Sequence, residues 1–119
     1  MDKQVKQALA QDQVIDITTI GRKTGRPRRI EIWFHRWNGR YYITGLPGKR
    51  SWYANLLAHP EFTFHLKGSA QADLPARARP ILAEEERRKT LTVLLQNMDR
   101  LDALDEWMTQ SPLVEVEFI

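Results

Sequence analysis

The dipeptide Asn38-Gly39 lies between two short runs with strand character, and it constrains the local fold more than any other feature of the sequence. Asn followed by Gly supplies the two positive-φ residues of a type I′ turn, whose twist matches that of paired antiparallel strands. Apolar and polar residues alternate over residues 30–35 before the turn, and residues 40–44 follow it. The period of two and the turn together predict a β-hairpin.

Other segments extend this pattern along the chain. Residues 14–20 are β-branched almost throughout, which favours a strand. Pro75 and Pro80 indicate that a strand over residues 70–81 is an edge or bulged strand. Alternation predicts further strands over residues 62–66 and 114–118. Helices are predicted over residues 5–13, 52–58, 84–98 and 101–108.

The order of these elements predicts the fold class. About six strands joined mostly by tight turns, with inserted and flanking helices, predict an α+β fold built on an antiparallel, barrel-like sheet. The βαβ rhythm of a doubly wound fold is absent from the sequence. With 119 residues, the chain is expected to form one domain over residues 1–119.

The composition excludes several classes of function. No apolar stretch approaches the roughly 20 residues that span a bilayer, so no transmembrane segment is expected. The first residues lead into a mixed polar segment that lacks the apolar region of a signal peptide. Without cysteine, the chain forms no disulfide, thiol nucleophile or iron–sulfur cluster. We therefore expect a cytoplasmic protein.

Positive charge is concentrated in one part of the chain. Nine of the eighteen Lys and Arg residues lie between Gly21 and Arg50, where Glu31 is the sole acid. The centre of this part is the turn Gly-Arg-Lys-Thr-Gly-Arg-Pro-Arg-Arg at residues 21–29. Its glycines let the backbone approach a ligand, and arginine binds phosphate or carboxylate oxygens bidentately. The turn is therefore a candidate anion site, and the alternative is a solvated turn whose charges serve solubility alone. The charge comes from Arg22, Lys23, Arg26 and Arg28.

A second glycine-rich loop, residues 45–51, leads into the predicted helix over residues 52–58. Lys49 and Arg50 stand beside the expected helix N-terminus, where backbone N–H groups favour an anion. The loop lacks the spacing of a Walker nucleotide-binding motif, so nucleotide hydrolysis is not expected.

Six aromatic residues lie near the two basic loops in the sequence, and such residues form the walls of sites for flat cofactors. The alternative is that they belong to the core or to half-buried surface. The three histidines have no metal-ligand spacing, and no catalytic carboxylate pair or Ser/His/Asp set can be argued. If the protein is an enzyme, a bound cofactor is expected to carry out the chemistry. The six residues are Trp33, Trp37, Tyr41, Tyr42, Trp52 and Tyr53.

Residues 17–28, Ile-Thr-Thr-Ile-Gly-Arg-Lys-Thr-Gly-Arg-Pro-Arg, resemble the Thr-Thr-x-Gly-Arg-Lys-[Ser/Thr]-Gly-x-Pro-Arg signature of the deazaflavin-dependent nitroreductases. Trp-Tyr-Ala-Asn-Leu at residues 52–56 is similar to the family's Trp-Tyr-x-Asn-Leu, and the resemblance spans about residues 14–119. It implies a split β-barrel of the flavin-binding type, related to the pyridoxamine-phosphate-oxidase-like fold.

The resemblance also implies a reductase that uses reduced coenzyme F-420, a deazaflavin with a phosphate and an oligoglutamate tail. Hydride would pass from the deazaflavin ring to an electron-poor acceptor such as a quinone, a nitro compound or an enone. The residues carried over by position are Arg22, Lys23, Thr24 and Arg28 for the phosphate and tail, Trp52 and Asn55 beside the cofactor, and Trp33 facing the active pocket.

The sequence departs from the family at residues 45–51, where the loop is shorter and lacks a Ser-Lys pair. Lys49 or Arg50 would compensate as a cofactor contact, and flavin mononucleotide (FMN) remains an alternative cofactor. A protein that binds cofactor without turnover is also left open. The pI of 9.4 suggests a nucleic-acid-binding module, but the cations form a compact turn, so no nucleic-acid partner is expected. A homodimer is expected because an incompletely closed barrel leaves strand edges to cover.

Overall fold

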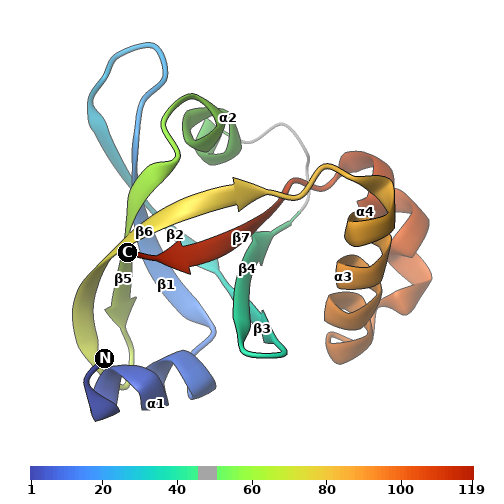
Figure 1. Ribbon diagram of the computed structural model, residues 1–119, viewed down its shortest axis with the longest axis horizontal. Coiled ribbons are helices and arrows are strands. Elements are labelled where there is room, and N and C mark those ends of the chain that lie inside the picture. Colours follow the sequence, from blue (N-terminus) through green and yellow to red (C-terminus); the bar gives the residue numbers. More distant parts are fainter. Residues whose placement is uncertain (46–50) are drawn as a thin grey trace.

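The computed structural model describes residues 1–45 and 51–119, and Figure 1 shows how the elements are arranged. No helix in these two segments combines the length and apolarity that crossing a membrane requires. The strands are β1 (Val14–Ile20), β2 (Pro27–Trp33), β3 (His35–Trp37), β4 (Arg40–Thr44), β5 (Glu61–Lys67), β6 (Gln71–Pro80) and β7 (Leu113–Phe118). The helices are α1 (Lys3–Gln11), α2 (Ser51–Ala58), α3 (Glu84–Asn97), a 3-10 helix (Leu101–Ala103) and α4 (Leu104–Gln110).

The seven strands form one antiparallel sheet in the order β2-β1-β5-β6-β7-β4-β3. β2 and β3 occupy opposite ends of this order, yet a single residue, Phe34, separates them in the chain. The sheet must therefore curl until its two ends approach each other, which gives the half-barrel of Figure 1. This architecture confirms the expected α+β split barrel.

Phe34 explains why the sheet has seven strands rather than about six. The chain changes partner strand within the single strand predicted over residues 30–35. As far as Trp33 it pairs with β1, and from His35 it pairs with β4. At the change, the Phe34 N–H donates to the Gln13 carbonyl at 2.9 Å, and the Phe34 side chain is buried in the core. Because the alternation of side chains continues across this point, the sequence pattern does not reveal the break.

β6 lies between β5 and β7, and its register with each of them is unbroken, so the expectation of an edge or bulged strand is wrong. Each of its prolines lies outside the ladder that β6 forms with one of its two neighbours. Pro75 pairs with Thr63 of β5, but the ladder to β7 begins only at Ala76. Pro80 pairs with Val114 of β7, beyond the last pair with β5. The interior strand can therefore contain residues that lack an N–H donor.

The concave face of the sheet holds the main core. Ile15, Ile17 and Thr19 of β1 are buried there, whereas Asp16 and Thr18 point to the outer face. α1 packs two buried residues against this core, and helices α3 and α4 cover a second apolar cluster at β4 and β7. α2 lies near the turn between β1 and β2, and this end of the half-barrel carries the candidate site (Figure 1).

Candidate functional site

The basic turn joins β1 to β2 and is closed by its own hydrogen bonds. The Gly21 N–H donates to the Arg26 carbonyl, and the Gly25 N–H donates to the Gly21 carbonyl, each at 2.8 Å. Gly25 has a φ of 68°, in the left-handed region that glycine adopts without strain. The Thr24 hydroxyl accepts from the Arg26 N–H at 3.2 Å. The turn is therefore a compact loop, and its residues 22–26 are exposed.

Asn55 of α2 connects this turn to the sheet. Its Oδ1 accepts a hydrogen bond from the Arg22 N–H at 3.0 Å, and its Nδ2 donates to Thr19 Oγ1 at 3.1 Å. Thr19 and Asn55 are 1% and 7% exposed, so water competes little for either bond. Each bond is worth on the order of 1 kcal/mol. One side chain thereby fixes the distance between the turn and α2.

A pocket of about 260 Å³ lies between the turn and α2, and we call it the turn pocket. Its lining includes Gly21 and Ser51, and Ser51 is the first residue of α2. Backbone N–H groups at a helix N-terminus carry partial positive charge, so the helix end and the basic side chains favour the same kind of ligand, an anion. Five of the nine sequence-predicted residues line this pocket together: Arg22, Lys23, Thr24, Arg28 and Asn55.

Strand alternation separates the two adjacent arginines of β2. Arg28 lies opposite Thr19 and lines the turn pocket, whereas Arg29 lies opposite Thr18 on the outer face. There the Arg29 guanidinium binds Asp16 at 2.9 Å. Four cations of the turn make no ion pair with an acid of the described segments, and their charge is available to an anionic ligand. They are Arg22, Lys23, Arg26 and Arg28.

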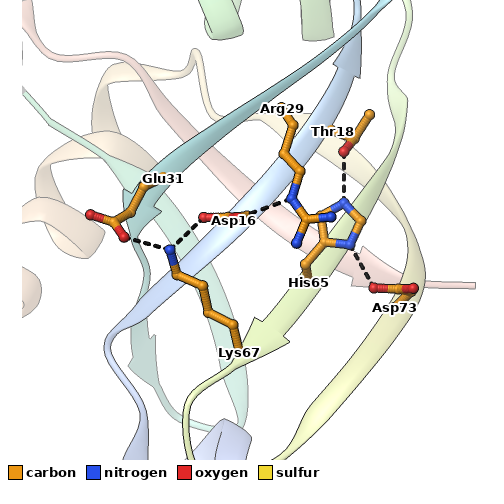
Figure 2. A network of polar contacts seen from close by, with 7 residues as sticks. All are labelled: Asp16, Thr18, Arg29, Glu31, His65, Lys67 and Asp73. Atoms are coloured by element: carbon orange, nitrogen blue, oxygen red, sulfur yellow. Dashed lines mark hydrogen bonds and ion pairs between the residues drawn. The ribbon is translucent and has the colours of Figure 1, made fainter.

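On the outer face of the sheet, basic and acidic side chains neutralise one another, as Figure 2 shows. Lys67 of β5 binds Asp16 at 2.7 Å and also binds Glu31 of β2. The hydrogen bond from Lys67 holds the pKa of Asp16 below its ordinary value, burial opposes this shift, and Arg29 adds to it. The same contact with Asp16 raises the pKa of Lys67. This cluster, which we call the outer-face ladder, joins β2, β1 and β5.

His65 forms a second polar contact on the same face (Figure 2). Its Nε2 lies 2.6 Å from Thr18 Oγ1, and its Nδ1 lies 2.7 Å from Asp73 Oδ1. The hydrogen bond from His65 lowers the pKa of Asp73. No local sequence pattern indicates this contact, because 47 residues separate His65 from Thr18 in the chain.

A second pocket, of about 250 Å³, lies where the two ends of the curled sheet meet, and we call it the seam pocket. Trp33 of β2 is 55% exposed there, and Trp52 of α2 is buried. Trp52 Nε1 is buried and has no hydrogen-bond partner within residues 1–45 and 51–119. The structure thus places both tryptophans in a pocket next to α2 but apart from the basic residues. The lining residues are Glu31, Ile32, Trp33, Thr44, Gly45 and Trp52.

The other two sequence-predicted residues, Lys49 and Arg50, lie outside the described residues. Thr19 and Ser51 also belong to the site, although neither is among the residues predicted from the sequence. Thr19 is recognisable from strand alternation as an inward-facing residue, but its bond to Asn55 spans 36 residues of the chain. Ser51 joins the site because α2 approaches the turn, and that approach is a tertiary feature.

A model of the F420H(2)-dependent quinone reductase family matches residues 1–108 of the chain. The chain belongs to this family. Membership confirms the resemblance carried by the motif at residues 17–28, and it identifies the protein as a deazaflavin-dependent oxidoreductase with coenzyme F-420 as cofactor.

Solved structures share the fold. Conserved hypothetical protein Rv2991 from Mycobacterium tuberculosis matches with a TM-score of 0.75 and 16% identity, over 97% of this chain and 79% of that one. An F420-H2 dependent reductase (FDR-A) matches with a TM-score of 0.63 and 24% identity, over 89% of this chain and 95% of that one. A FAD-binding protein from Mesorhizobium loti matches with a TM-score of 0.65 and 13% identity, over 96% of this chain and 84% of that one. At these identities the likeness supports the split-barrel fold alone.

Proposed function

We propose that the turn pocket binds the phosphate and oligoglutamate tail of coenzyme F-420 and that the seam pocket contributes to holding its ring. The observation that carries this proposal is the group of cations around one pocket at the N-terminus of α2, which pair with no acid within residues 1–45 and 51–119. Arginine side chains and helix N-termini bind phosphates and carboxylates by charge-assisted hydrogen bonds. The tail of the cofactor consists of these groups.

Three features of the described residues fit this cofactor. A Cβ at Gly21 would lie 2.5 Å from Thr24 Oγ1, so glycine is what lets Thr24 fold over the turn and line the turn pocket. α2 borders both pockets, through Asn55 in one and Trp52 in the other, so one elongated ligand can contact both. Trp33 is 55% exposed in the seam pocket, so an aromatic face is open there to a flat ring.

When bound, reduced coenzyme F-420 supplies a hydride. The residues of the chain bind and orient: Arg22, Lys23 and Arg28 anchor the anionic tail, and Trp33 and Trp52 form walls that fix the plane of a ring and limit the access of water. Alignment of two reactants lowers the barrier to their reaction substantially. We therefore assign positioning and charge neutralisation, rather than acid–base chemistry, to these side chains.

We propose that the acceptor is an electron-poor planar molecule, a quinone in the first instance, with nitro compounds and enones as further candidates. The support is the matched family's description as quinone reductases and the aromatic walls of the seam pocket. A planar acceptor would stack on such walls with little loss of conformational entropy.

The experiment mixes the purified protein with reduced coenzyme F-420 and menadione, a nitroaromatic compound or cyclohexenone, and follows the absorbance of the oxidised cofactor. We expect oxidation with menadione well above the protein-free rate. At subsaturating cofactor, Lys23→Ala and Arg28→Ala are expected to slow it. The proposal is overturned if tens of micromolar coenzyme F-420 produce neither turnover nor a thermal shift.

FMN is the second candidate ligand, because the fold is shared with a protein described as FAD-binding. Its phosphate would suit the turn pocket, but FMN has no oligoglutamate tail to engage further cations. A thermal-shift comparison separates the two cofactors. We expect greater stabilisation by coenzyme F-420, and greater stabilisation by FMN, or yellow protein straight from expression, would reverse the assignment.

We also propose that the protein is a homodimer. β2 lies at one end of the sheet order, and its residues from Pro27 to Glu31 are exposed on both faces. Ile30 and Trp33 add exposed apolar area to this strand. Exposed edge strands with apolar side chains are usually covered in native proteins. Light scattering is expected to give about twice the chain mass of 13.9 kDa, and the mass of one chain would contradict the dimer.

A further inference from the structure

We infer that Thr19 and Asn55 are positioning residues that set the affinity of the turn pocket for the cofactor tail by fixing the basic turn on α2. The inference rests on the proposed function of the turn pocket and assigns a role that the motif alone does not give. The motif resemblance places Asn55 beside the cofactor. In the structure, both ends of its amide are already engaged by the protein.

The orientation of the Asn55 amide is fixed by its partners. The Arg22 N–H can only donate, so it requires the amide oxygen, Oδ1, at 3.0 Å. The amide nitrogen then faces Thr19, whose hydroxyl accepts at 3.1 Å. Because Thr19 and Asn55 are buried, the loss of one partner leaves a polar group without hydrogen bond or water. Thr19 therefore controls which way Asn55 points, and Asn55 controls where the turn lies.

The remainder of the turn cannot take over this function. Its other hydrogen bonds, between Gly21, Thr24, Gly25 and Arg26, run within the turn and set its shape. Among polar contacts in the described segments, the bond to Asn55 is the one that attaches the turn to α2. The shape of the turn and its place are thus determined separately. Loss of the Asn55 contact would leave the cations present but no longer preorganised around the pocket, which weakens binding.

The chain offers a matched control on the same strand. Thr18 and Thr19 are neighbours in β1, and each hydroxyl makes one hydrogen bond to a buried side chain. Thr18 contacts His65 on the outer face, and Thr19 contacts Asn55 beneath the turn. Replacement of either threonine by valine exchanges the hydroxyl for a methyl group of similar size and leaves the partner side chain without its hydrogen bond. Only the Thr19 replacement disturbs the turn.

The experiment compares Thr19→Val, Thr19→Ser and Thr18→Val for cofactor KM, kcat and thermal stability. It also measures the Kd of each for coenzyme F-420 and for the deazaflavin that lacks the phosphate and tail. Loss of a buried hydrogen bond is expected to raise the KM of Thr19→Val for coenzyme F-420 about 10-fold, with kcat at saturation within about 2-fold of wild type. Its affinity for the tailless deazaflavin is expected to stay unchanged. Thr19→Ser retains the hydroxyl and is expected to restore the wild-type KM.

Thr18→Val is expected to lose stability but to keep the wild-type KM. The inference is overturned if Thr19→Val binds coenzyme F-420 as wild type does, or if Thr18→Val and Thr19→Val raise the KM equally, which would indicate general destabilisation. Should Thr19→Val fail to fold, Thr19→Ala takes its place, because alanine leaves room for a water molecule. Thr19→Ala is expected to show the same rise in KM with kcat almost unchanged.

Failure of the proposed function gives a different result. In that case the wild-type protein itself shows no preference for coenzyme F-420 over the tailless deazaflavin. If the wild type has this preference and Thr19→Val retains it in full, the turn pocket binds the tail and the positioning role alone is wrong.

Discussion

The basic turn and the outer-face ladder contain the same kinds of side chain and share the strand β2, but they handle charge in opposite ways. In the ladder, Arg29 and Lys67 bind Asp16, and Lys67 also binds Glu31 (Figure 2). In the turn, the neighbouring Arg28 lines a pocket and has no acidic partner in the described part of the chain. Side-chain alternation along one strand therefore directs Arg28 to the turn pocket and the adjacent Arg29 to the outer face.

The difference shows that the proposed site is distinguished from the rest of the basic surface by the pairing of its cations rather than by their number. Paired charges on an exposed sheet face contribute little to stability, typically below about 1 kcal/mol for each pair. Several like charges without partners are mildly unfavourable until an anion binds. A protein that keeps them together at a helix N-terminus gains no stability from the arrangement, so the arrangement favours a binding function.

The largest expected effect separates the two regions directly. Arg28→Ala removes a charge-assisted contact to the cofactor tail and is expected to raise the Kd for coenzyme F-420 about 10- to 100-fold. Arg29→Ala removes the same side chain from the ladder and is expected to change the Kd by less than about 2-fold. Fluorescence titration of the cofactor measures both. Equal effects would show that bulk positive charge, and not the pocket, determines binding.

The next effect is a difference in response to salt. The cations of the turn pocket are exposed, so an increase from about 0.1 to about 1 M salt, which shortens the screening length from about 10 to about 3 Å, is expected to weaken cofactor binding roughly 3- to 10-fold. Arg28→Ala is expected to show a shallower dependence because one cation is missing. Titrations at four salt concentrations test this, and a Kd independent of salt would count against charge as the source of affinity.

We expect the outer-face ladder to make the free energy of unfolding depend on pH. The pKa of Asp16 is lowered below its ordinary value of 3.8. Its contribution to the free energy of unfolding is therefore present above that pH and is lost as the pH falls through the folded-state pKa. The pKa of Lys67 is raised above 10.5, so its contribution is lost only as the pH rises through that higher value. Asp16→Asn is expected to cost about 1 kcal/mol of unfolding free energy at pH 7 and almost nothing near pH 2.

Urea unfolding at several pH values measures this difference between wild type and Asp16→Asn. Cofactor affinity at neutral pH serves as the control and should be unaffected. A constant gap between the two proteins from neutral to strongly acidic pH would mean that the carboxylate charge of Asp16 contributes nothing.

The last effect, no larger than that of Asp16→Asn, concerns the shape of the turn. Gly25 has a φ of 68°, and a Cβ there would meet no atom within 4 Å, so strain alone opposes substitution. Gly25→Ala is expected to cost about 1 kcal/mol, and Gly25→Asn less, because asparagine tolerates the left-handed region. Thermal unfolding of the two variants provides the comparison, and equal midpoints would contradict the role of backbone strain.

Much of the fold was predictable because local patterns specify it. The strand over Val14–Ile20 and the hairpin at Asn38-Gly39 follow from residue type and turn chemistry, and both are present in the structure. The partner change at Phe34 was not predictable, because alternation is unbroken across it. The interior position of β6 was not predictable either. A proline outside the ladder to one neighbouring strand has the same appearance in the sequence as a proline on an edge strand.

The candidate site was predictable in its charge but not in its geometry. The glycines and cations of residues 21–29 indicate an anion site without any structure. Which arginine faces the pocket depends on the register between β1 and β2, and the place of Trp33 in a separate pocket depends on closure of the barrel. The contact between Thr19 and Asn55 joins two elements that no local pattern relates.

The most direct test of the central claim is the ratio of the two dissociation constants for coenzyme F-420 and for the deazaflavin without phosphate and tail, measured on wild type and on Arg28→Ala. We expect the wild type to bind the complete cofactor at least about 100-fold more tightly, as two or more charge-assisted contacts would give, and Arg28→Ala to lose much of this preference. Equal affinity of the wild type for both deazaflavins would contradict the assignment of the turn pocket to the anionic tail.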